Sequence, residues 1–210
     1  MLHILGKIPK KVYIAVSGGS DSMAVLDFLS RGNREVVAAH FDHGTEHGEE
    51  ARKFIEGYCL ERSIPLVIGE KKRERNSDES PEEYWRNMRY DFFASITMQV
   101  GSAPIITAHT LDDQVENWIF TALNGEPRLI PYSREPNIIR PFITTTKTTL
   151  LSWCDRKNVP YVVDPGNSDS RYMRSLIRTE IVPQALRVNP GLFKVIKKKV
   201  LISMTSLVPY

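Results

Sequence analysis

The sequence predicts an α/β fold with a mostly parallel sheet, helices on both faces of that sheet, and further helices at the C-terminal end. The first observation behind this prediction is an alternation of short, β-branched apolar segments with longer segments of helical periodicity. The second is that polar clusters follow several strand-like segments, at the carboxyl ends where open parallel sheets collect their ligands. The third is size, because 210 residues, 41% of them hydrophobic, are enough to bury one core.

The first half of the chain consists of strand and helix pairs. We expect strands at residues 12–16, 36–41, 66–68 and 104–108, and helices from about residue 21 and at 49–62, 81–100 and 111–123. Ser80, Pro81 and Glu83 mark the start of the third helix as an N-cap, a first-turn proline and a capping-box acid. The charged residues 69–80 before it predict a loop, either a solvated connector or a segment that closes over a substrate.

The second half is predicted to contain a long loop and more helices. We expect a loop at 124–141, a helix at 146–157, a strand at 159–164, a turn-rich segment at 164–170, and helices at 171–188 and 191–204. This division predicts one domain over residues 1–188 and a short helical appendage over 189–210. The appendage is basic through Lys194, Lys197, Lys198 and Lys199.

Residues 17–22, with the sequence SGGSDS, are predicted to hold phosphate. Gly18 and Gly19 lie between a strand and a helix, so backbone N–H groups and the positive end of the helix dipole can face an anion. The GxxxxGK pattern followed by serine or threonine is absent, which argues against a P-loop kinase or GTPase. The alternative is a tight turn in which Ser20 or Asp21 only caps the helix.

Residues 109–116, with the sequence HTLDDQVE, predict a second cluster at the end of a later strand. A helix beginning near Thr110 places His109, Asp113 and Glu116 on neighbouring turns. Two carboxylates and an imidazole on one face could hold a divalent cation, neutralise an ammonium group or remove a proton from an amine. A capping pair of Thr110 with Asp113 is the alternative, but it leaves His109, Asp112 and Glu116 unexplained.

Further polar residues follow the second strand. In residues 40–44, HFDHG, the alternation of a strand points His40 and Asp42 to one side and turns His43 into the loop. We favour contacts with a nucleotide there over a metal site, because two histidines and one acid within four residues are a weak metal signal.

Two groups of arginines could contact a polyanion. Arg86 and Arg89 lie one turn apart, and Arg171, Arg174 and Arg178 recur at helical spacing. The alternatives are a surface pair of Arg86 with Glu82 and a solvated face for the second group.

Composition restricts the class of protein further. The net charge of +3 is mildly basic, so an acidic partner is permitted without being required. Cys59 and Cys154 make no CxxC pair, which argues against a thiolate metal site and favours a reducing compartment. The order of charged and apolar residues at the start does not fit a signal peptide, and no stretch is long enough to cross a membrane. We expect a cytoplasmic protein that does not act at a membrane.

Taken together, these segments resemble the tRNA(Ile)-lysidine synthase family, in the same order and at similar spacing over nearly the whole chain. The SGGxDS loop is shared by the wider group of PP-loop ATP pyrophosphatases, whereas HxDHG, RxxRY and AHxxDDQxE in combination are more specific. A late pattern adds to the resemblance: Asp164, Asn167, Asp169, Tyr172, Arg174, Ile177, Arg178, Ile181 and Pro183, followed by Asn189 and Pro190.

The resemblance implies a catalytic domain of the PP-loop ATP pyrophosphatase fold and a two-step reaction on tRNA. ATP would adenylate the C2 oxygen of the wobble cytidine in tRNA(Ile) with a CAU anticodon, and free L-lysine would displace AMP to give lysidine. ATP would contact Ala15, Ser17, Gly18, Gly19, Ser20, Asp21, Ser22 and His43, with Mg²⁺ at Asp21. Catalysis would use Asp21, Arg89, Asp113 and Arg178; lysine would contact His109, Asp113 and Glu116; tRNA would contact Arg86, Arg171 and Arg174.

The chain departs from the family in two places. Residues 124–131, NGEPRLIP, stand where the family usually has a glycine-rich segment, and many members continue into tRNA-binding domains beyond the position of Pro190. One alternative function is therefore a related tRNA 2-thiolation, which the spacing of the two cysteines makes a poor fit. The other is a tRNA-binding module without catalytic activity.

Overall fold

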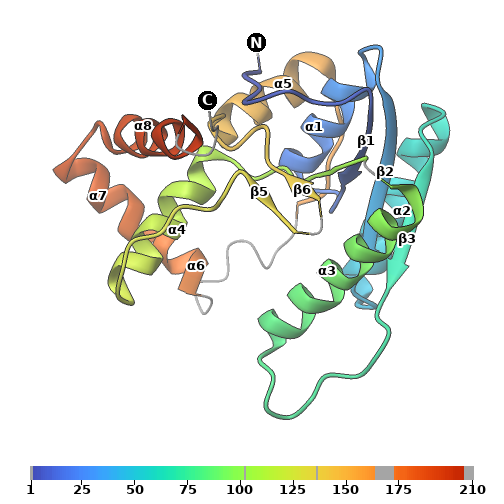
Figure 1. The fold of residues 1–210 in the computed structure, drawn as a ribbon, viewed down its shortest axis with the longest axis horizontal. Coiled ribbons are helices and arrows are strands. Elements are labelled where there is room, and N and C mark those ends of the chain that lie inside the picture. Colours follow the sequence, from blue (N-terminus) through green and yellow to red (C-terminus); the bar gives the residue numbers. More distant parts are fainter. Residues whose placement is uncertain (1, 102, 136, 164–172, 206–210) are drawn as a thin grey trace.

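The computed structural model describes residues 2–101, 103–135, 137–163 and 173–205. In this part of the chain, strands β1 to β6 form one sheet in the order β3-β2-β1-β4-β6-β5, in which only the β5–β6 pair is antiparallel (Figure 1). The strands are β1 Lys11–Ala15, β2 Glu35–Asp42, β3 Leu66–Glu70, β4 Ile105–Ile106, β5 Ser133–Arg134 and β6 Ile138–Ile139. The predicted mostly parallel sheet is confirmed, and the reversal of order beside β1 brings the ends of β1, β2 and β4 together.

Most of the helices cover this sheet, and the last ones extend beyond it. They are α1 Ser20–Ser30, α2 Glu46–Glu61, α3 Pro81–Val100, α4 Leu111–Leu123, α5 Lys147–Lys157, α6 Met173–Leu176, the π-helical turn Ile177–Ile181, α7 Val182–Val188 and α8 Leu192–Thr205. None of the described helices is long and apolar enough to cross a membrane.

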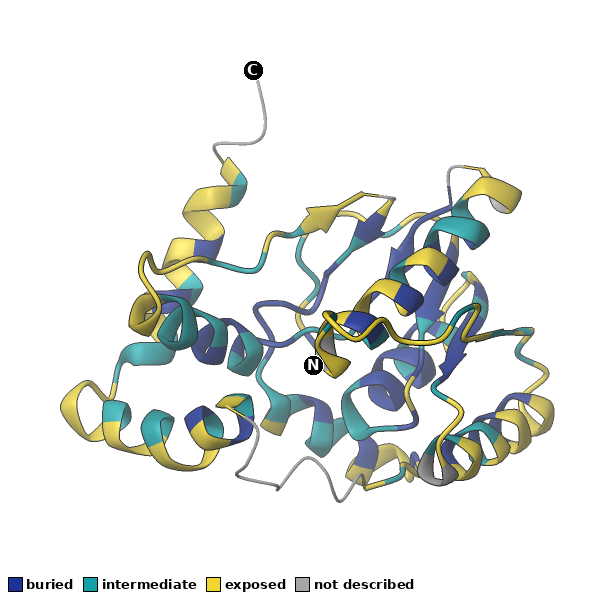
Figure 2. Cartoon of the chain, turned by 90° about the horizontal axis from the view of Figure 1, so that it is seen from below, coloured by how far each residue is buried: buried dark blue, intermediate teal, exposed yellow. Residues whose placement is uncertain are grey.

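Alternate residues of β1 build the two sides of the core. Val12 and Ile14 pack with α1, α2 and α5 on one face, whereas Tyr13 packs with α3 on the other. The buried residues accordingly form the middle of the molecule, and the outer faces of the helices are exposed (Figure 2). Helix α3 lies so close to β3 that a Cβ atom on Gly69 would collide with the ring of Phe92. The predicted two-sided packing is confirmed.

A third apolar cluster joins α4 to the C-terminal helices. Leu111 and Val115 of α4 pack around Ile196 of α8, with Trp118 and Phe193 at the edge of the cluster. These helices lie together on one side of the sheet (Figure 1). The division into a domain at 1–188 and an appendage at 189–210 stays a prediction.

Two predicted elements differ from the structure. Residues 133–139, expected within a loop, contain β5 and β6. Residues 159–163, expected as most of a strand, contain no strand in the described part of the chain. Residues 159–163 pair with no strand of the described sheet. Instead, the backbone N–H of Val162 donates to the carbonyl of Gly18 at 2.9 Å, so this segment supports the glycine loop.

The predicted helix over residues 171–188 is interrupted. Residues 171 and 172 lie outside the described part, and a π-helical turn separates α6 from α7. The N–H of Val182 donates to the carbonyl of Ile177, five residues back, and Pro183 has no N–H to continue the regular pattern. The π-helical turn, which is wider than an α-helical turn, therefore lies next to Pro183.

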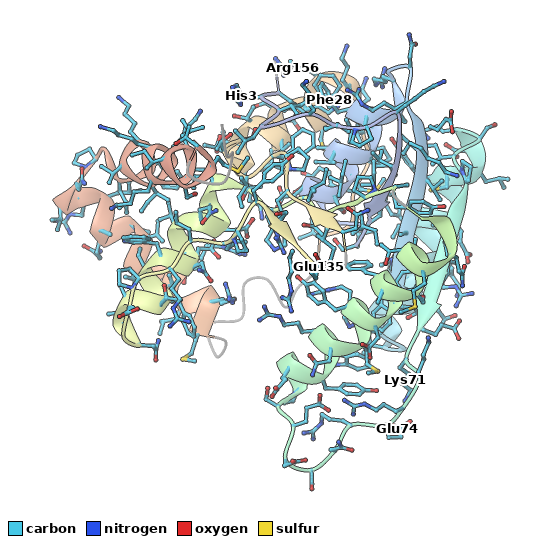
Figure 3. The ribbon with its side chains drawn as sticks, viewed as in Figure 1. His3, Phe28, Lys71, Glu74, Glu135 and Arg156 are labelled. Carbon is cyan, nitrogen blue, oxygen red and sulfur yellow. The ribbon has the colours of Figure 1, made fainter. Side chains whose placement is uncertain are left out.

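The charged loop before α3 is held by its own ion pairs. Lys71 Nζ lies 2.7 Å from Glu74 Oε1, and Arg73 Nη2 lies 2.8 Å from Glu79 Oε2. Figure 3 places Lys71 and Glu74 in the segment that leads into α3. The caps predicted at Ser80 and Pro81 are confirmed, since the Ser80 hydroxyl accepts from the N–H of Glu83.

Candidate active site

The carboxyl ends of β1, β2 and β4 border a cavity of about 290 Å³. Eight of the residues predicted from the sequence line it: Ala15, Ser17, Asp21, Ser22, His43, Arg89, His109 and Asp113. The other lining residues are Val16, Ala39, Phe41, Tyr90, Phe93, Thr107 and Ala108. The signal that could have found Ala39 and Phe41 is the alternation of β2, which gives residues two apart one face.

The loop at residues 17–22 leaves the start of α1 open to an anion. Gly18 has a φ of +85°, which favours glycine. The Ser22 hydroxyl donates to the carbonyl of Gly19 at 3.0 Å and accepts from the N–H of Ser17 at 3.2 Å. The N-cap is Gly19, and no side chain in the described structure caps α1. The alternative that Ser20 or Asp21 caps this helix is therefore wrong, and the first-turn N–H groups stay available to phosphate.

Asp21, in the same loop, lies beside Lys147, a cation that was not predicted from the sequence. Lys147 Nζ is 3.6 Å from Asp21 Oδ2, whereas Asp21 Oδ1 is buried and accepts no hydrogen bond from the described residues. Burial raises the pKa of Asp21 to about 6, against the opposing effect of Lys147 and with help from Asp113 and Asp112. A buried carboxylate oxygen that lacks a partner fits a bound cation, so Asp21 meets the requirement for the predicted Mg²⁺.

The start of α4 is held by the predicted capping pair. Asp113 Oδ2 accepts from the N–H of Thr110 at 2.7 Å and from its hydroxyl at 2.8 Å, and Thr110 Oγ1 accepts from the N–H of Asp113. Asp112 Oδ2 accepts from the backbone N–H of Lys147 at 2.8 Å. The capping interpretation is thus confirmed for Asp113, which nevertheless also lines the cavity.

His109 faces the same cavity as a neutral ring. Its Nδ1 lies 2.9 Å from Thr107 Oγ1. Burial lowers the pKa of His109 well below its usual range; Asp113 opposes this effect, and the guanidinium groups of Arg140 and Arg89 add to it. At pH 7 the ring is therefore neutral and offers an unprotonated nitrogen to a bound group, although the lowered pKa makes it a weak base.

Glu116 pairs with Arg178. Arg178 donates from Nε to Oε1 at 2.6 Å and from Nη2 to Oε2 at 2.9 Å, and the Glu116 side chain is 6% exposed. Burial raises the pKa of Glu116, and Arg178 opposes that effect. Neither residue lines the cavity, so the face predicted from His109, Asp113 and Glu116 is divided between the cavity and an ion pair.

The polar residues at the end of β2 and just after it have separate environments. His40 Nδ1 lies 2.9 Å from the carbonyl oxygen of Val16, and Asp42 Oδ1 accepts from the N–H of Gly44 at 2.8 Å. The His43 ring packs between Phe41 and Trp85, with ring centroids 5.2 and 5.0 Å away. In the part of the chain that is described, no three His, Cys, Asp or Glu side chains could by themselves hold a metal ion.

We predict that the His40 ring is the Nδ1–H tautomer and takes up its second proton at a lower pH than an ordinary histidine. A carbonyl oxygen only accepts, so Nδ1 must carry the proton; burial lowers the pKa of His40 although the bond to Val16 opposes the effect. Because the unfolded chain takes up this proton at a higher pH than the folded chain, His40 lowers stability as the pH falls below about 6.5. Nitrogen-15 NMR of the His40 ring measures both its tautomer and the pH at which it is protonated. A His40 midpoint at or above about 6.5, the ordinary value for histidine, would contradict the prediction.

The predicted Arg86 and Arg174 lie beside aromatic rings, and Arg86 shares its ring with Arg134 and Arg140, which the sequence did not single out. Arg134 lies 4.0 Å and Arg86 6.0 Å from the centroid of the Tyr90 ring, and Arg140 Nη2 donates to the Tyr90 hydroxyl at 3.3 Å. Arg174 lies 5.5 Å from the Phe120 ring centroid. Arg171 and the side chain of Glu82 lie outside the described residues, so the predicted tRNA contact of Arg171 and the pairing of Arg86 with Glu82 stay untested.

Comparison with known proteins relates this site to a family. A model described as a PP-loop domain matches residues 3–185. The chain is 32% identical to the bifunctional protein TilS/HprT of Listeria innocua, over 93% of this chain and 33% of that protein. It is 33% identical to the tRNA(Ile)-lysidine synthase of Thermotoga maritima, over 93% of this chain and 50% of that protein. The chain therefore spans about a third to a half of the length of these curated relatives.

A solved structure shares the fold. The U34-tRNA thiolase NcsA from Methanococcus maripaludis, described with its 4Fe-4S cluster, superposes with a TM-score of 0.77 at 17% identity. The match covers 97% of this chain and 74% of the thiolase chain. At this identity the likeness establishes the shared architecture, in agreement with the fold predicted from the sequence.

Proposed function

The chain belongs to the PP-loop domain family, and from this premise we propose that it uses ATP to modify a tRNA base. Specifically, it adenylates the wobble cytidine of tRNA(Ile) with a CAU anticodon and replaces AMP by free L-lysine, forming lysidine. The observation that carries this proposal is one cavity in which the open start of α1 and Asp21 meet His109 and Asp113. A phosphate-binding end and a proton-accepting end in one cavity suit a reaction that first activates a base and then receives an amine.

In the first step, the C2 oxygen of the cytidine attacks the α-phosphorus of ATP, the bond to the β-phosphate oxygen breaks, and pyrophosphate leaves. The N–H groups of the first turn of α1 and the hydroxyl of Ser17 hold the phosphates, while the Ser22 hydroxyl fixes the loop through its hydrogen bond to Gly19. The apolar walls at Ala39 and Phe93 accommodate the purine. Asp21 would hold Mg²⁺, which would offset negative charge on the phosphates. Arg89, which lines the cavity, stabilises charge on the reacting α-phosphate.

In the second step, the ε-amine of lysine attacks C2, the C2–O bond breaks, and AMP leaves. The amine must first lose a proton. The neutral His109 ring lies in the cavity as a hydrogen-bond partner for the ammonium group, while its lowered pKa makes it a weak base for that transfer. Asp113 lines the same cavity and offers a carboxylate to the ammonium group before that transfer. Glu116 acts through Arg178, whose guanidinium it holds beside α4 with two hydrogen bonds.

We predict that the full chain incorporates radiolabelled lysine into bulk tRNA in the presence of ATP and Mg²⁺, and releases one pyrophosphate for each lysine. A tRNA(Ile) transcript with uridine at the wobble position is the control and should accept none. Release of pyrophosphate from ATP with tRNA but without lysine incorporation would contradict lysine as the nucleophile, while leaving the adenylation step supported.

The two alternative functions predict different results in the same assay. Thiolation that depends on cysteine is disfavoured because Cys59 and Cys154 are buried in the core and burial raises the pKa of each thiol to about 11. A binding module would bind tRNA in a salt-dependent way without releasing pyrophosphate. Since the reaction consumes ATP and tRNA, we propose the cytoplasm as its location.

A further inference from the structure

We propose that Lys147 is a catalytic residue that contacts the β- and γ-phosphates of ATP, and that Asp112 positions it; this inference rests on the proposed function. Lys147 Nζ lies 3.6 Å from Asp21 Oδ2, beside the loop that would hold those phosphates. The loop itself, residues 17–22, contains no lysine or arginine. Lys147 thus supplies the full positive charge that other phosphate-binding loops carry in their own sequence.

The backbone of Lys147 is fixed by contacts from several parts of the fold. Its N–H donates to Asp112 Oδ2 at 2.8 Å, which ties the first residue of α5 to the first turn of α4. Thr145, two residues before Lys147, is buried, donates from its hydroxyl to the carbonyl of His3, and accepts at its own carbonyl from the N–H of Leu111. Helix α5 also packs along α1, which carries Asp21. The two clusters predicted from the sequence, residues 17–22 and 109–116, therefore lie at the starts of the two helices that fix the backbone of Lys147.

The end of the Lys147 side chain is free to change partner. The side chain is 38% exposed, and its single ion pair in the described structure is with Asp21. If Asp21 takes a divalent cation, two positive groups would compete for one carboxylate, and the ammonium group gains by moving to the incoming phosphate oxygens. The pair with Asp21 therefore keeps the lysine beside the loop while ATP is absent. The hydrogen bond from the backbone of Lys147 also gives a role to Asp112, a residue that the N-cap of α4 does not use.

The test measures binding of inorganic pyrophosphate and of AMP to the full chain by calorimetry, without Mg²⁺. We expect Lys147→Met to weaken pyrophosphate binding by about ten- to a hundredfold, as for loss of one charge-assisted hydrogen bond, and to leave AMP binding unchanged. Lys147→Arg should recover most of the affinity. Lys157→Met, at the other end of the same helix, is the matched control and should bind both ligands as the parent does.

The role of Asp112 is tested separately, by measuring kcat and KM of its variants for the release of pyrophosphate from ATP. Asp112→Ala should lower kcat as Lys147→Met does, and adding it to Lys147→Met should cause no further loss. Asp112→Asn keeps an acceptor for the N–H of Lys147 and should retain activity. Additive losses in the double variant would contradict the positioning role.

The outcomes separate this inference from the proposed function. A parent chain that neither binds pyrophosphate nor releases it from ATP would overturn the proposed function. A parent chain that binds pyrophosphate no better than Lys147→Met, or a variant that loses AMP and pyrophosphate binding equally, would overturn the assignment of Lys147 alone.

Discussion

Asp21→Asn is expected to lower ATP-dependent pyrophosphate release by about 10²- to 10³-fold, the cost of removing one preorganised charge from a reacting phosphate. The same change should leave the thermal midpoint of unfolding at or above that of the parent. The reason is that Oδ1 of Asp21 is buried without a described partner and that burial raises its pKa to about 6, so the ionised carboxylate is held at a cost to stability. Loss of activity combined with retained stability is the signature of a residue kept for function.

The measurement pairs a pyrophosphate-release assay with a thermal melt. Asp155→Asn is the control, because Asp155 is exposed on α5 and does not line the cavity. It should change neither quantity. A melt in which Asp21→Asn unfolds several degrees below the parent would mean that Asp21 stabilises the fold, and its loss of activity would then not identify a phosphate or metal site.

The position of Asp21 could be predicted from the sequence because it depends on local features. A β-branched run, two glycines and a helical segment specify a strand, a turn and a helix start, and parallel strands bring such turns to one edge. Asp113 was predictable for the same reason, and its capping pair with Thr110 is also local. For these residues, the order of elements along the chain was sufficient to place them at one cavity.

The partners of these residues could not be predicted, because they come from distant elements. Lys147 reaches Asp21 only after α5 has packed on α1, and Arg178 lies 62 positions after Glu116. Helical spacing relates residues three or four apart and carries no information about such pairs. The strands β5 and β6, at two residues each, are likewise too short to produce a period-two pattern. The sequence did not predict these strands or these partners for the same reason: both depend on tertiary packing, which leaves no local pattern in the sequence.

The Glu116–Arg178 pair is expected to couple the C-terminal helices to the site. Arg178 lies in the π-helical turn between α6 and α7, so its two hydrogen bonds to Glu116 fasten that turn to α4. Arg178→Met should lower the free energy of unfolding by about 1–3 kcal/mol, less than the full cost of breaking a buried pair because the arginine is partly exposed. The loss arises because Glu116 is left as a buried carboxylate without its cation.

A double-mutant cycle with Glu116→Gln measures this coupling. Adding Glu116→Gln to Arg178→Met removes the uncompensated charge, so the double variant should be more stable than Arg178→Met alone, with an interaction energy of about 1 kcal/mol or more. The exposed pair Glu49–Lys53, with 2.7 Å between Oε1 and Nζ, is the matched control, and Glu49→Gln should change stability by less than about 0.5 kcal/mol. If Glu116 acts only through Arg178, both single variants should raise KM for lysine and leave KM for ATP unchanged. Additive stability changes, together with an unchanged KM for lysine, would show that the pair neither fastens α4 to the C-terminal helices nor shapes the lysine site.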